Sequence, residues 1–238
     1  DDLNNDGLQT VGEPGMSNIL IRLINESGKV QDSTRSNAAG IYTLVDVPVG
    51  KYRLQFEKPT GYLNAFNNNT DPTKNSKPNA DTGITSLIDF SVAGTYDNMD
   101  GGYVKAGNVG DAVWLDLNGN GIQQANEPGI ENITVELYTV AGIKVGETKT
   151  FVRTSDDFIG YYNLPNVRPG SYYIKSLLPS NYIVSQANAS GDSATDSDIT
   201  GLNGVNTTDV FAVGIGETIT NIDAGAYLPA TIGDFVWN

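Results

Sequence analysis

The sequence contains no cysteine and no histidine. Disulfide bonds, catalytic thiols, Ser-His-Asp triads and zinc sites built from Cys or His are therefore excluded. Basic residues are also scarce, with 14 Lys and Arg against 28 Asp and Glu. This acidic balance argues against nucleic acid and anionic membrane surfaces as partners, whereas it suits a protein that binds cations.

Long apolar runs are missing as well. No run is long enough to span a bilayer, and the first residues do not show the basic and then apolar pattern of a signal peptide. We therefore expect no membrane insertion, and an export signal that has been removed or lies outside this sequence. The length of 238 residues accommodates two domains of ordinary size.

The most informative stretch is the loop at residues 116–127. Oxygen-bearing side chains occupy its positions 1, 3, 5 and 12, and Gly121 occupies position 6. This is the spacing of a calcium-binding loop, in which the backbone carbonyl at position 7 and a bidentate Glu at position 12 complete the shell. Residues 2–13 repeat the pattern. The predicted ligands are Asp2, Asn4, Asp6, Leu8 (carbonyl), Glu13, Asp116, Asn118, Asn120, Ile122 (carbonyl) and Glu127.

Both loops open the same succession of short β-rich runs separated by Gly and Pro turns. This pattern predicts an all-β fold of tandem Ig-like or Greek-key β-sandwich domains with calcium-binding loops. The predicted strands are 19–24, 30–34, 41–44, 51–56, 87–92 and 101–104 in the first repeat, and 110–114 and 133–138 in the second.

The repeat also predicts the domain boundaries. Residues 1–106 form a first repeat that lacks its first strand, and residues 107–229 form a second. Residues 230–238 repeat the Gly-Asp-x-Val-Trp pattern of residues 110–114. We expect this last segment to be the first strand of a third repeat or a donor strand for a neighbouring chain. An array cut at arbitrary points is the alternative.

The motifs resemble those of a known family. Gly-Asp-x-Val-Trp stands at 110–114, Glu-Pro-Gly at 127–129, Asp-x-x-Gly-x-Tyr at 157–162 and Pro-Gly-x-Tyr at 169–172. Together with the loops they resemble the calcium-binding B-type repeat domain of serine-aspartate repeat adhesins, a relative of the collagen-adhesin B fold. The resemblance implies a secreted or cell-surface stalk module that binds several calcium ions per repeat.

The same resemblance implies further calcium ligands outside the two loops. They are Asp111, Asp157, Asp196, Asp198 and Asp223 in the second repeat, Asn37, Asn79, Asp81 and Asp100 in the first, and Asp234 in the last segment. Asn37 and Asn79 align with Asp157 and Asp196 in this scheme. We expect lower calcium affinity in the first repeat, because these replacements remove negative charge.

The function predicted from these observations is structural and not enzymatic. The chain would be a calcium-stiffened spacer of an extracellular stalk, fibre or filament, in contact with neighbouring repeats or with copies of itself. Strand addition through residues 232–238 would join such copies head to tail.

Two alternative functions are weighed against this one. Exposed aromatics such as Tyr161, Tyr162, Tyr172 and Tyr173 suit an adhesive module for a carbohydrate or protein ligand, although adjacent tyrosines on a strand place one ring in the core. Paired carboxylates also serve glycoside hydrolysis, but here the clustered acids have the spacing of calcium loops. The resemblance to B-type domains also implies the option of an internal Lys-Asn isopeptide bond, which a loss of ammonia from the intact mass would reveal.

Overall fold

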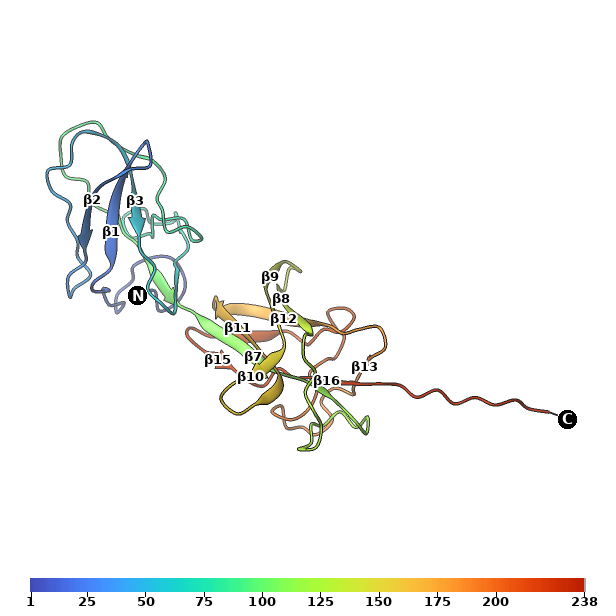
Figure 1. Ribbon diagram of the computed structural model, residues 1–238. Coiled ribbons are helices and arrows are strands. Elements are labelled where there is room, and N and C mark those ends of the chain that lie inside the picture. Colours follow the sequence, from blue (N-terminus) through green and yellow to red (C-terminus); the bar gives the residue numbers. More distant parts are fainter. Residues whose placement is uncertain (238) are drawn as a thin grey trace. The chain divides into compact units, whose positions relative to one another are not determined.

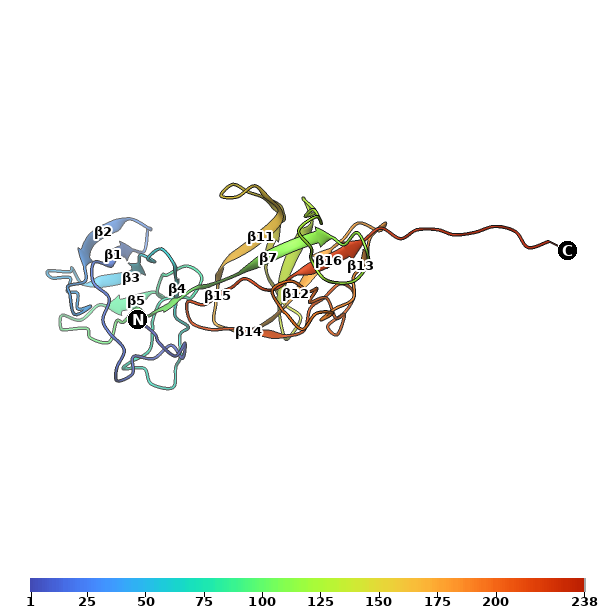
Figure 2. The same ribbon diagram turned by 90° about the horizontal axis from the view of Figure 1, so that it is seen from below.

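The computed structural model describes residues 1–237, which form strands, turns and loops (Figures 1 and 2). Their secondary structure confirms the predicted all-β class. The chain divides into two compact units, Asp1–Ala106 and Gly107–Asn238. No helix suited to crossing a membrane occurs in the part of the chain that is described. Asn238, which ends the segment 230–238, lies outside the described residues.

The first unit is built on one antiparallel sheet and a short two-stranded pair. The sheet has the strand order β2 (Val30–Arg35), β1 (Leu20–Asn25), β3 (Gly50–Phe56), β5 (Ile88–Phe90), and the pair joins β4 (Tyr62–Asn64) to β6 (Tyr103–Lys105). Strands β1, β2, β3, β5 and β6 overlap the β-rich runs expected from the sequence, whereas β4 lies outside them.

The core of the first unit lies on one face of this sheet. Ile21 and Leu23 of β1 stand opposite Phe56 and Leu54 of β3, and all four side chains are buried. The residues between them on both strands are more exposed. This follows from the two-residue period of a strand, which sends successive side chains to opposite faces.

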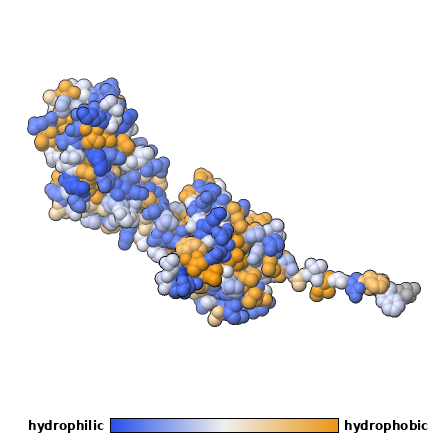
Figure 3. All heavy atoms as spheres, in the orientation of Figure 1, coloured by the Kyte–Doolittle hydropathy of each residue, from blue (hydrophilic) through white to orange (hydrophobic). Residues whose placement is uncertain are grey.

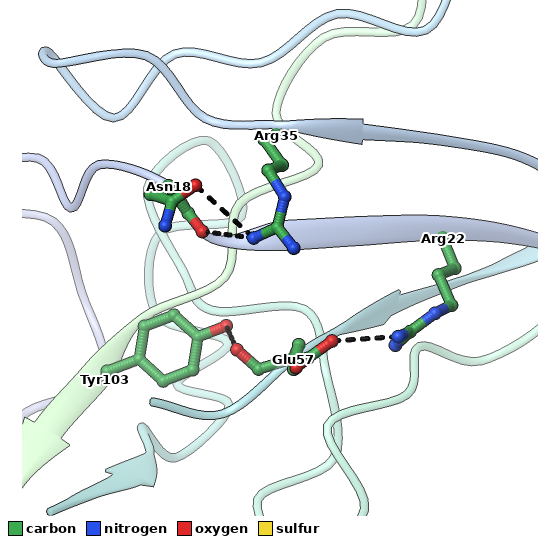
Figure 4. A network of polar contacts seen from close by, with 5 residues as sticks. All are labelled: Asn18, Arg22, Arg35, Glu57 and Tyr103. Atoms are coloured by element: carbon green, nitrogen blue, oxygen red, sulfur yellow. Dashed lines mark hydrogen bonds and ion pairs between the residues drawn. The ribbon is translucent and has the colours of Figure 1, made fainter. Parts of the chain in front are cut away.

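Polar contacts tie the strands of the first unit together near their ends (Figure 4). The Tyr103 hydroxyl of β6 donates to the carbonyl oxygen of Glu57, at 3.0 Å, and the Glu57 carboxylate pairs with Arg22 of β1 at 2.9 Å. Arg35 of β2 donates to the carbonyl oxygen of Asn18, at 2.8 Å. The Tyr103 ring is thereby fixed beside the end of β3.

The second unit is a sandwich of two sheets. The first has the order β10 (Phe151–Arg153), β11 (Phe158–Val167), β7 (Gly107–Leu115), β16 (Ala224–Tyr227), β13 (Ile183–Val184), with β15 (Thr218–Ile219) also on β7, and the second has the order β14 (Phe211–Val213), β12 (Gly170–Leu177), β8 (Thr134–Thr139), β9 (Lys144–Lys149). Val113, Val135, Tyr162 and Ile174 are among the side chains that fill the space between the sheets.

Strand β7 is the central strand of its sheet. It runs antiparallel to β11, with Tyr162 opposite Asp111, and parallel to β16, with Ala224 opposite Val113. Trp114 near its end is 0% exposed. The Gly-Asp-x-Val-Trp motif is thus the core strand of this unit.

One predicted strand of the first unit is absent. Residues 41–44 belong to no ladder, although Tyr42 donates to the carbonyl oxygen of Met99, at 2.5 Å, as Tyr162 of β11 donates to that of Ile222, at 2.6 Å. This prediction was wrong because a β-rich sequence forms a strand only where a neighbouring strand supplies hydrogen bonds. In the second unit β7 supplies them.

Candidate metal-binding sites

The loop at residues 116–127 turns its side-chain oxygens inward. The buried Asp116 carboxylate accepts hydrogen bonds from the amides of Gly119 and Gly121, at 2.7 and 2.8 Å. The Asn118 and Asn120 side-chain oxygens accept from the amides two residues further on, at 3.0 and 2.9 Å. Each of these oxygens therefore lies on the inner side of the turn that the loop makes.

Glu127 closes this loop from its last position. One carboxylate oxygen accepts from the amide of Leu117 at 2.8 Å, and the other accepts from that of Gln124 at 3.0 Å. Gly121 has a φ of 76°, and a Cβ at this position would lie 2.2 Å from the carbonyl oxygen of Gln186. The sharp turn at position 6 therefore requires glycine for its dihedral angle and for its space.

The loop at residues 2–13 has the same hydrogen-bond pattern. The Asp2 carboxylate accepts from the amides of Asp6 and Gly7 at 3.2 and 3.0 Å. The Glu13 carboxylate accepts from those of Leu3 and Thr10 at 2.9 and 2.7 Å. Two stretches predicted from one motif thus adopt one conformation, which brings together the predicted side-chain ligands of each loop.

Each loop is covered by a long segment of its own unit that we call the polar connection, residues 65–87 between β4 and β5 in the first unit and residues 185–210 between β13 and β14 in the second. Ile122 forms a β-bridge with Asp196, and Leu8 forms the matching bridge with Asn75. Asp196 is buried, and its Oδ1 has no hydrogen-bond partner among residues 1–237. A buried carboxylate oxygen without a donor is costly unless a cation stands beside it.

A second group of carboxylates converges between β7, β16 and the polar connection of the second unit. The Asp198 carboxylate accepts from the amide of Asp223 at 2.7 Å, and the Asp223 carboxylate accepts from that of Ala112 at 3.1 Å. The Oδ2 of Asp223 is buried and finds no hydrogen-bond partner in the described chain. We name Asp111, Asp198 and Asp223 the acidic pocket.

The electrostatics of the acidic pocket disfavour ionisation without a cation. Burial, followed by repulsion from Asp111, raises the pKa of Asp223 to about 9. Burial and the neighbouring carboxylates raise the pKa of Asp198 to about 6, and burial raises that of Asp111. The three carboxylates of the acidic pocket influence one another's ionisation but are not close enough together to form a ready coordination shell, and neither are any other three acidic side chains of residues 1–237.

The hydrogen bonds also define which residues of the first unit correspond to these acids. The amide of Lys77 donates to the carbonyl oxygen of Asp100 at 2.8 Å, as that of Asp198 donates to the carbonyl oxygen of Asp223 at 2.9 Å. Asn75, which bridges Leu8, takes the place of Asp196. The first unit therefore has an amide and an ammonium group where the second has two carboxylates.

This correspondence replaces the one expected from the sequence for Asn79 and Asp81. Both are exposed, and the Asn79 side-chain oxygen accepts from the amides of Asp81 and Thr82 at 3.0 and 3.1 Å, which caps a local turn. The sequence signal that identifies the true equivalents is an acid followed four residues later by Asn-Ser or Asp-Ser, at 71–76 and 192–197.

The remaining predicted ligands lie outside the acidic pocket. Asp157 and Asn37 are exposed turn residues, and Asn37 uses its side-chain oxygen to accept from the amides of Ala39 and Ile41 at 2.9 and 3.0 Å. Asp234 is exposed in the last segment. The structure thus brings together the loop residues and the acidic pocket but not these three.

The aromatic residues that suggested an adhesive surface are engaged in packing. Tyr162 and Tyr172 are buried in the core. Tyr161 packs edge-on against Phe151, with centroids 5.4 Å apart, and the Tyr173 ring stacks on Tyr138, with centroids 5.3 Å apart. One ring of each adjacent pair is inside and the other outside, as the strand period requires.

The acidic pocket leads to a prediction for calcium-free buffer. Because the folded-state pKa values of Asp198 and Asp223 lie above the ordinary value of about 3.9, the folded protein binds protons more tightly than the unfolded chain. Their stabilising contribution is complete below about pH 4 and is lost as the pH rises through the folded-state values.

Thermal melts between pH 5 and 7.5 will measure this dependence as the difference between the protein and an Asp223→Asn variant. We expect the second unit of the unsubstituted protein to gain stability relative to the variant as the pH falls. A difference independent of pH would contradict the assignment.

Comparisons with known proteins give matches over the whole chain. The SdrD B-like domain model matches residues 1–103 and again residues 107–226. The chain is 32% identical over 240 residues to serine-aspartate repeat-containing protein F of Staphylococcus epidermidis (strain ATCC 12228), and 31% identical over 241 residues to serine-aspartate repeat-containing protein D of Staphylococcus aureus (strain MW2). All of the chain is covered, but only 14% and 16% of these relatives.

Solved structures are similar at much lower identity. The minor pilin GBS52 of Streptococcus agalactiae is 14% identical, with 97% of this chain and 91% of that chain covered and a TM-score of 0.35. The shaft pilin SpaA of Lactobacillus rhamnosus GG is 11% identical, with 96% and 95% covered and a TM-score of 0.34.

Proposed function

The chain belongs to the family of SdrD B-like domains, and from this premise we propose that it is a calcium-stiffened tandem spacer in an extracellular stalk or fibre. The curated relatives extend far beyond the part that this chain matches. The proposal therefore concerns the mechanical and metal-binding properties of two consecutive β-sandwich repeats.

The observation that carries the proposal is the shared conformation of the two loops. In both, a position-1 carboxylate and a position-12 carboxylate are held by amides of the loop itself. A loop of this kind presents several oxygens to one centre, and Ca²⁺ prefers six to eight oxygen ligands. Magnesium suits it less, because Mg²⁺ requires a near-ideal octahedron and retains its waters.

In this proposal the second unit holds calcium at two places. The loop ion is bound by Asp116, Asn118, Asn120, Glu127 and the carbonyl of Ile122, with Asp196 beside it. The second ion is bound in the acidic pocket. Its positive charge offsets the burial and mutual repulsion that disfavour ionisation of these carboxyl groups in its absence.

Calcium in the acidic pocket would join three parts of the sandwich. Asp111 belongs to β7, Asp223 directly precedes β16, and Asp198 comes from the polar connection. An ion between them links the central strand to its neighbour and to the loop layer. An ion present at about a hundred times its Kd adds roughly 2.7 kcal/mol to the free energy of unfolding.

The first unit is proposed to bind fewer ions. Its loop at residues 2–13 is intact, but Asn75 and Lys77 replace the two acids of the polar connection. Burial raises the pKa of Asp100, and the ammonium group of Lys77 offsets part of this rise. A lysine thus supplies the positive charge in this unit that an ion supplies in the other.

Native mass spectrometry of the calcium-saturated protein tests this distribution. We expect Asp223→Asn to remove one ion, because an amide replaces the central carboxylate of the acidic pocket. The same variant should melt higher than the original protein in calcium-free buffer at pH 7.5, because folding no longer requires the carboxyl group of Asp223 to take up a proton far above its ordinary pKa.

Glu131→Gln is the matched control, since Glu131 is exposed, lies in the same unit and carries the same charge. This variant should retain every ion. An unchanged ion count in Asp223→Asn would remove the acidic pocket from the proposal, and the absence of bound calcium at millimolar concentration would remove the whole proposal.

A fibre made of separate copies of such a spacer requires a contact that joins one copy to the next. We propose that strand addition through residues 232–238 provides it, with a strand from one copy entering the sheet of another. Such a contact joins two different surfaces, so that copies follow head to tail.

A further inference from the structure

The loop at residues 116–127 contains two asparagines that are each followed directly by glycine, at Asn118-Gly119 and Asn120-Gly121. In such a pair the backbone nitrogen of the glycine attacks the side-chain carbonyl carbon of the asparagine, and glycine permits this best because it has no Cβ to hinder the approach. The side-chain amide group leaves as ammonia, taking the proton of the attacking nitrogen, and a five-membered succinimide remains. Water then opens this ring to aspartate or isoaspartate.

Both asparagines are open to solvent, which supplies the water for the second step. Asn118, Gly119 and Asn120 are exposed, and a Cβ on Gly119 would meet no atom within 4 Å. The loop follows β7 in the second unit (Figure 1), and Figure 3 shows hydrophilic residues over much of the visible surface of this unit. Gly121 is more enclosed, since it is buried and lies against the carbonyl oxygen of Gln186. Asn118-Gly119 is therefore the pair that is freer to react.

One carboxylate holds both of the attacking nitrogens. The amide of Gly119 donates to Oδ1 of Asp116 at 2.7 Å, and the amide of Gly121 donates to Oδ2 at 2.8 Å. Attack requires the amide nitrogen to lose its proton and to turn toward the side chain of its own asparagine. A carboxylate is far too weak a base to remove that proton, so its hydrogen bond stabilises the unreactive N–H form. Asp116 thus withholds the nucleophile of each pair.

The side chains under attack are held as well. Oδ1 of Asn118 accepts from the amide of Asn120 at 3.0 Å, and Oδ1 of Asn120 accepts from the amide of Ile122 at 2.9 Å. These bonds fix the orientation of each side-chain amide group within the turn. Each pair therefore reacts only when the loop opens locally, and the rate of deamidation follows how often it opens.

The same chain contains two references for this behaviour. Asn203-Gly204 is the third Asn-Gly pair of the sequence, and the amide of Gly204 donates to a neutral acceptor, the carbonyl oxygen of Gly201, at 3.1 Å. Such a bond is weaker than one to a carboxylate. The loop at residues 2–13 contains no Asn-Gly pair. The loop of the second unit is therefore the one that deamidation modifies.

The two products alter this loop in opposite ways. Aspartate at position 5 already occurs in the loop at residues 2–13, where Oδ1 of Asp6 accepts from the amide of Leu8 at 2.8 Å, as the Asn120 oxygen accepts from the amide two residues on at 2.9 Å. This product keeps the turn and adds a negative charge. Isoaspartate places one extra carbon in the main chain, which changes the spacing between position 1 and the closing Glu127.

We propose that Asn118 and Asn120 are sites of spontaneous deamidation, with Asn118 the first to react, and that the hydrogen bonds of Asp116 protect both while the loop is ordered. The loop thereby records irreversibly the time that it has spent open. Because the shielding bonds belong to the loop itself, the protection does not depend on the calcium of the proposed function.

Peptide mass mapping of the full chain after incubation at mildly alkaline pH tests the proposal. Trypsin separates Asn118 and Asn120, in the peptide 106–144, from Asn203, in the peptide 176–238, and fragment ions locate the modified residue. The loop pairs should deamidate roughly tenfold or more slowly in the folded protein than in the same protein unfolded in guanidinium, with smaller protection at Asn203. Equal rates in the folded and unfolded protein, or a loop that does not react when unfolded, would overturn the proposal.

Asp116→Asn tests the shielding, because an amide accepts the two bonds more weakly than a carboxylate. Loop deamidation should become roughly tenfold faster, while Asn203 in the same molecule keeps its rate and shows that the unit is folded. If the variant unfolds, shown by equal acceleration at Asn203, the folded and unfolded rates of the unsubstituted protein decide the question. A folded variant whose loop reacts no faster would contradict the role of Asp116.

Two control variants accompany this substitution. Glu131→Gln removes an exposed acid of the same unit outside the loop, and it should leave every rate unchanged. Asn118→Gln combined with Asn120→Gln should abolish deamidation of the loop, because the six-membered ring that glutamine would form closes far more slowly. A mass gain that persists in this double variant would place the reaction at other residues.

Repeating the incubation with calcium and with chelator keeps these results separate from the proposed function. Slower loop deamidation in calcium would support both proposals, because an ion bound to the folded loop keeps it closed. Protection that is the same in both buffers would leave the shielding by Asp116 standing, while calcium binding in the loop fails. Calcium bound by a protein whose loop asparagines are unprotected would overturn the shielding alone.

Discussion

The melting temperature of the second unit is expected to fall by about 10 °C for each calcium ion that a chelator removes. An ion at about a hundred times its Kd contributes roughly 2.7 kcal/mol, and 1 kcal/mol shifts the midpoint of a domain of this size by about 4 °C. Calorimetric melts with millimolar calcium and with excess EGTA measure the shift. Loop and acidic pocket together should make calcium a major part of the stability of this unit.

Two variants decide whether the loop at residues 116–127 is responsible for the effect of calcium on the melting temperature. Glu127→Gln weakens the position-12 ligand and should reduce the difference between the calcium and EGTA melts, whereas Glu131→Gln should leave it unchanged. Glu127 also accepts amides of its own loop, so the informative quantity is the difference between the two buffers, not the melting temperature itself. A melt that is identical with and without chelator would contradict calcium stiffening.

Trp114→Ala is expected to destabilise the second unit by about 3–5 kcal/mol, the usual cost of removing a buried tryptophan. Trp114 is 0% exposed and lies near the end of β7, the central strand of its sheet. Its ring packs close to the backbone of Gly225. With about 4 °C for each kcal/mol, the midpoint of this unit should fall by roughly 12–20 °C. Circular dichroism melts in dilute protein will measure it.

Trp237→Ala is the matched control for this substitution. Trp237 is 77% exposed, so its removal should change the stability of the monomer by no more than about 0.5 kcal/mol. A loss of monomer stability equal to that of Trp114→Ala would show that the two tryptophans are not in the different environments described here.

The features that could be predicted from the sequence are those fixed by local pattern. The β-rich composition of residues 19–24 predicts β1, and the alternation of polar and apolar residues at 51–56 predicts β3, because a strand with one buried face shows that alternation in its own sequence. The conformation of both loops could be expected for the same reason, since their oxygens bond amides only a few residues away.

The features that could not be predicted depend on distant partners. Residues 41–44 have the composition of a strand, yet their ladder depends on a strand like β7 that lies far away in the sequence. The acidic pocket needed the pairing of β7 with the segment before β16 to bring Asp111 and Asp223 together. Lys77 was overlooked because the polar connections of the two units differ in length and composition beyond the shared turn.

The parallel pairing of β7 with β16 bears on how a stalk would respond to tension. These are the first and last strands of the second unit, and Val113–Leu115 lie beside Ala224–Ala226. A pull applied through the two ends of the unit draws these neighbouring strands in opposite directions along their length. Their hydrogen bonds are then sheared together and not opened one at a time, so the unit resists extension most strongly along the axis of the fibre it would form.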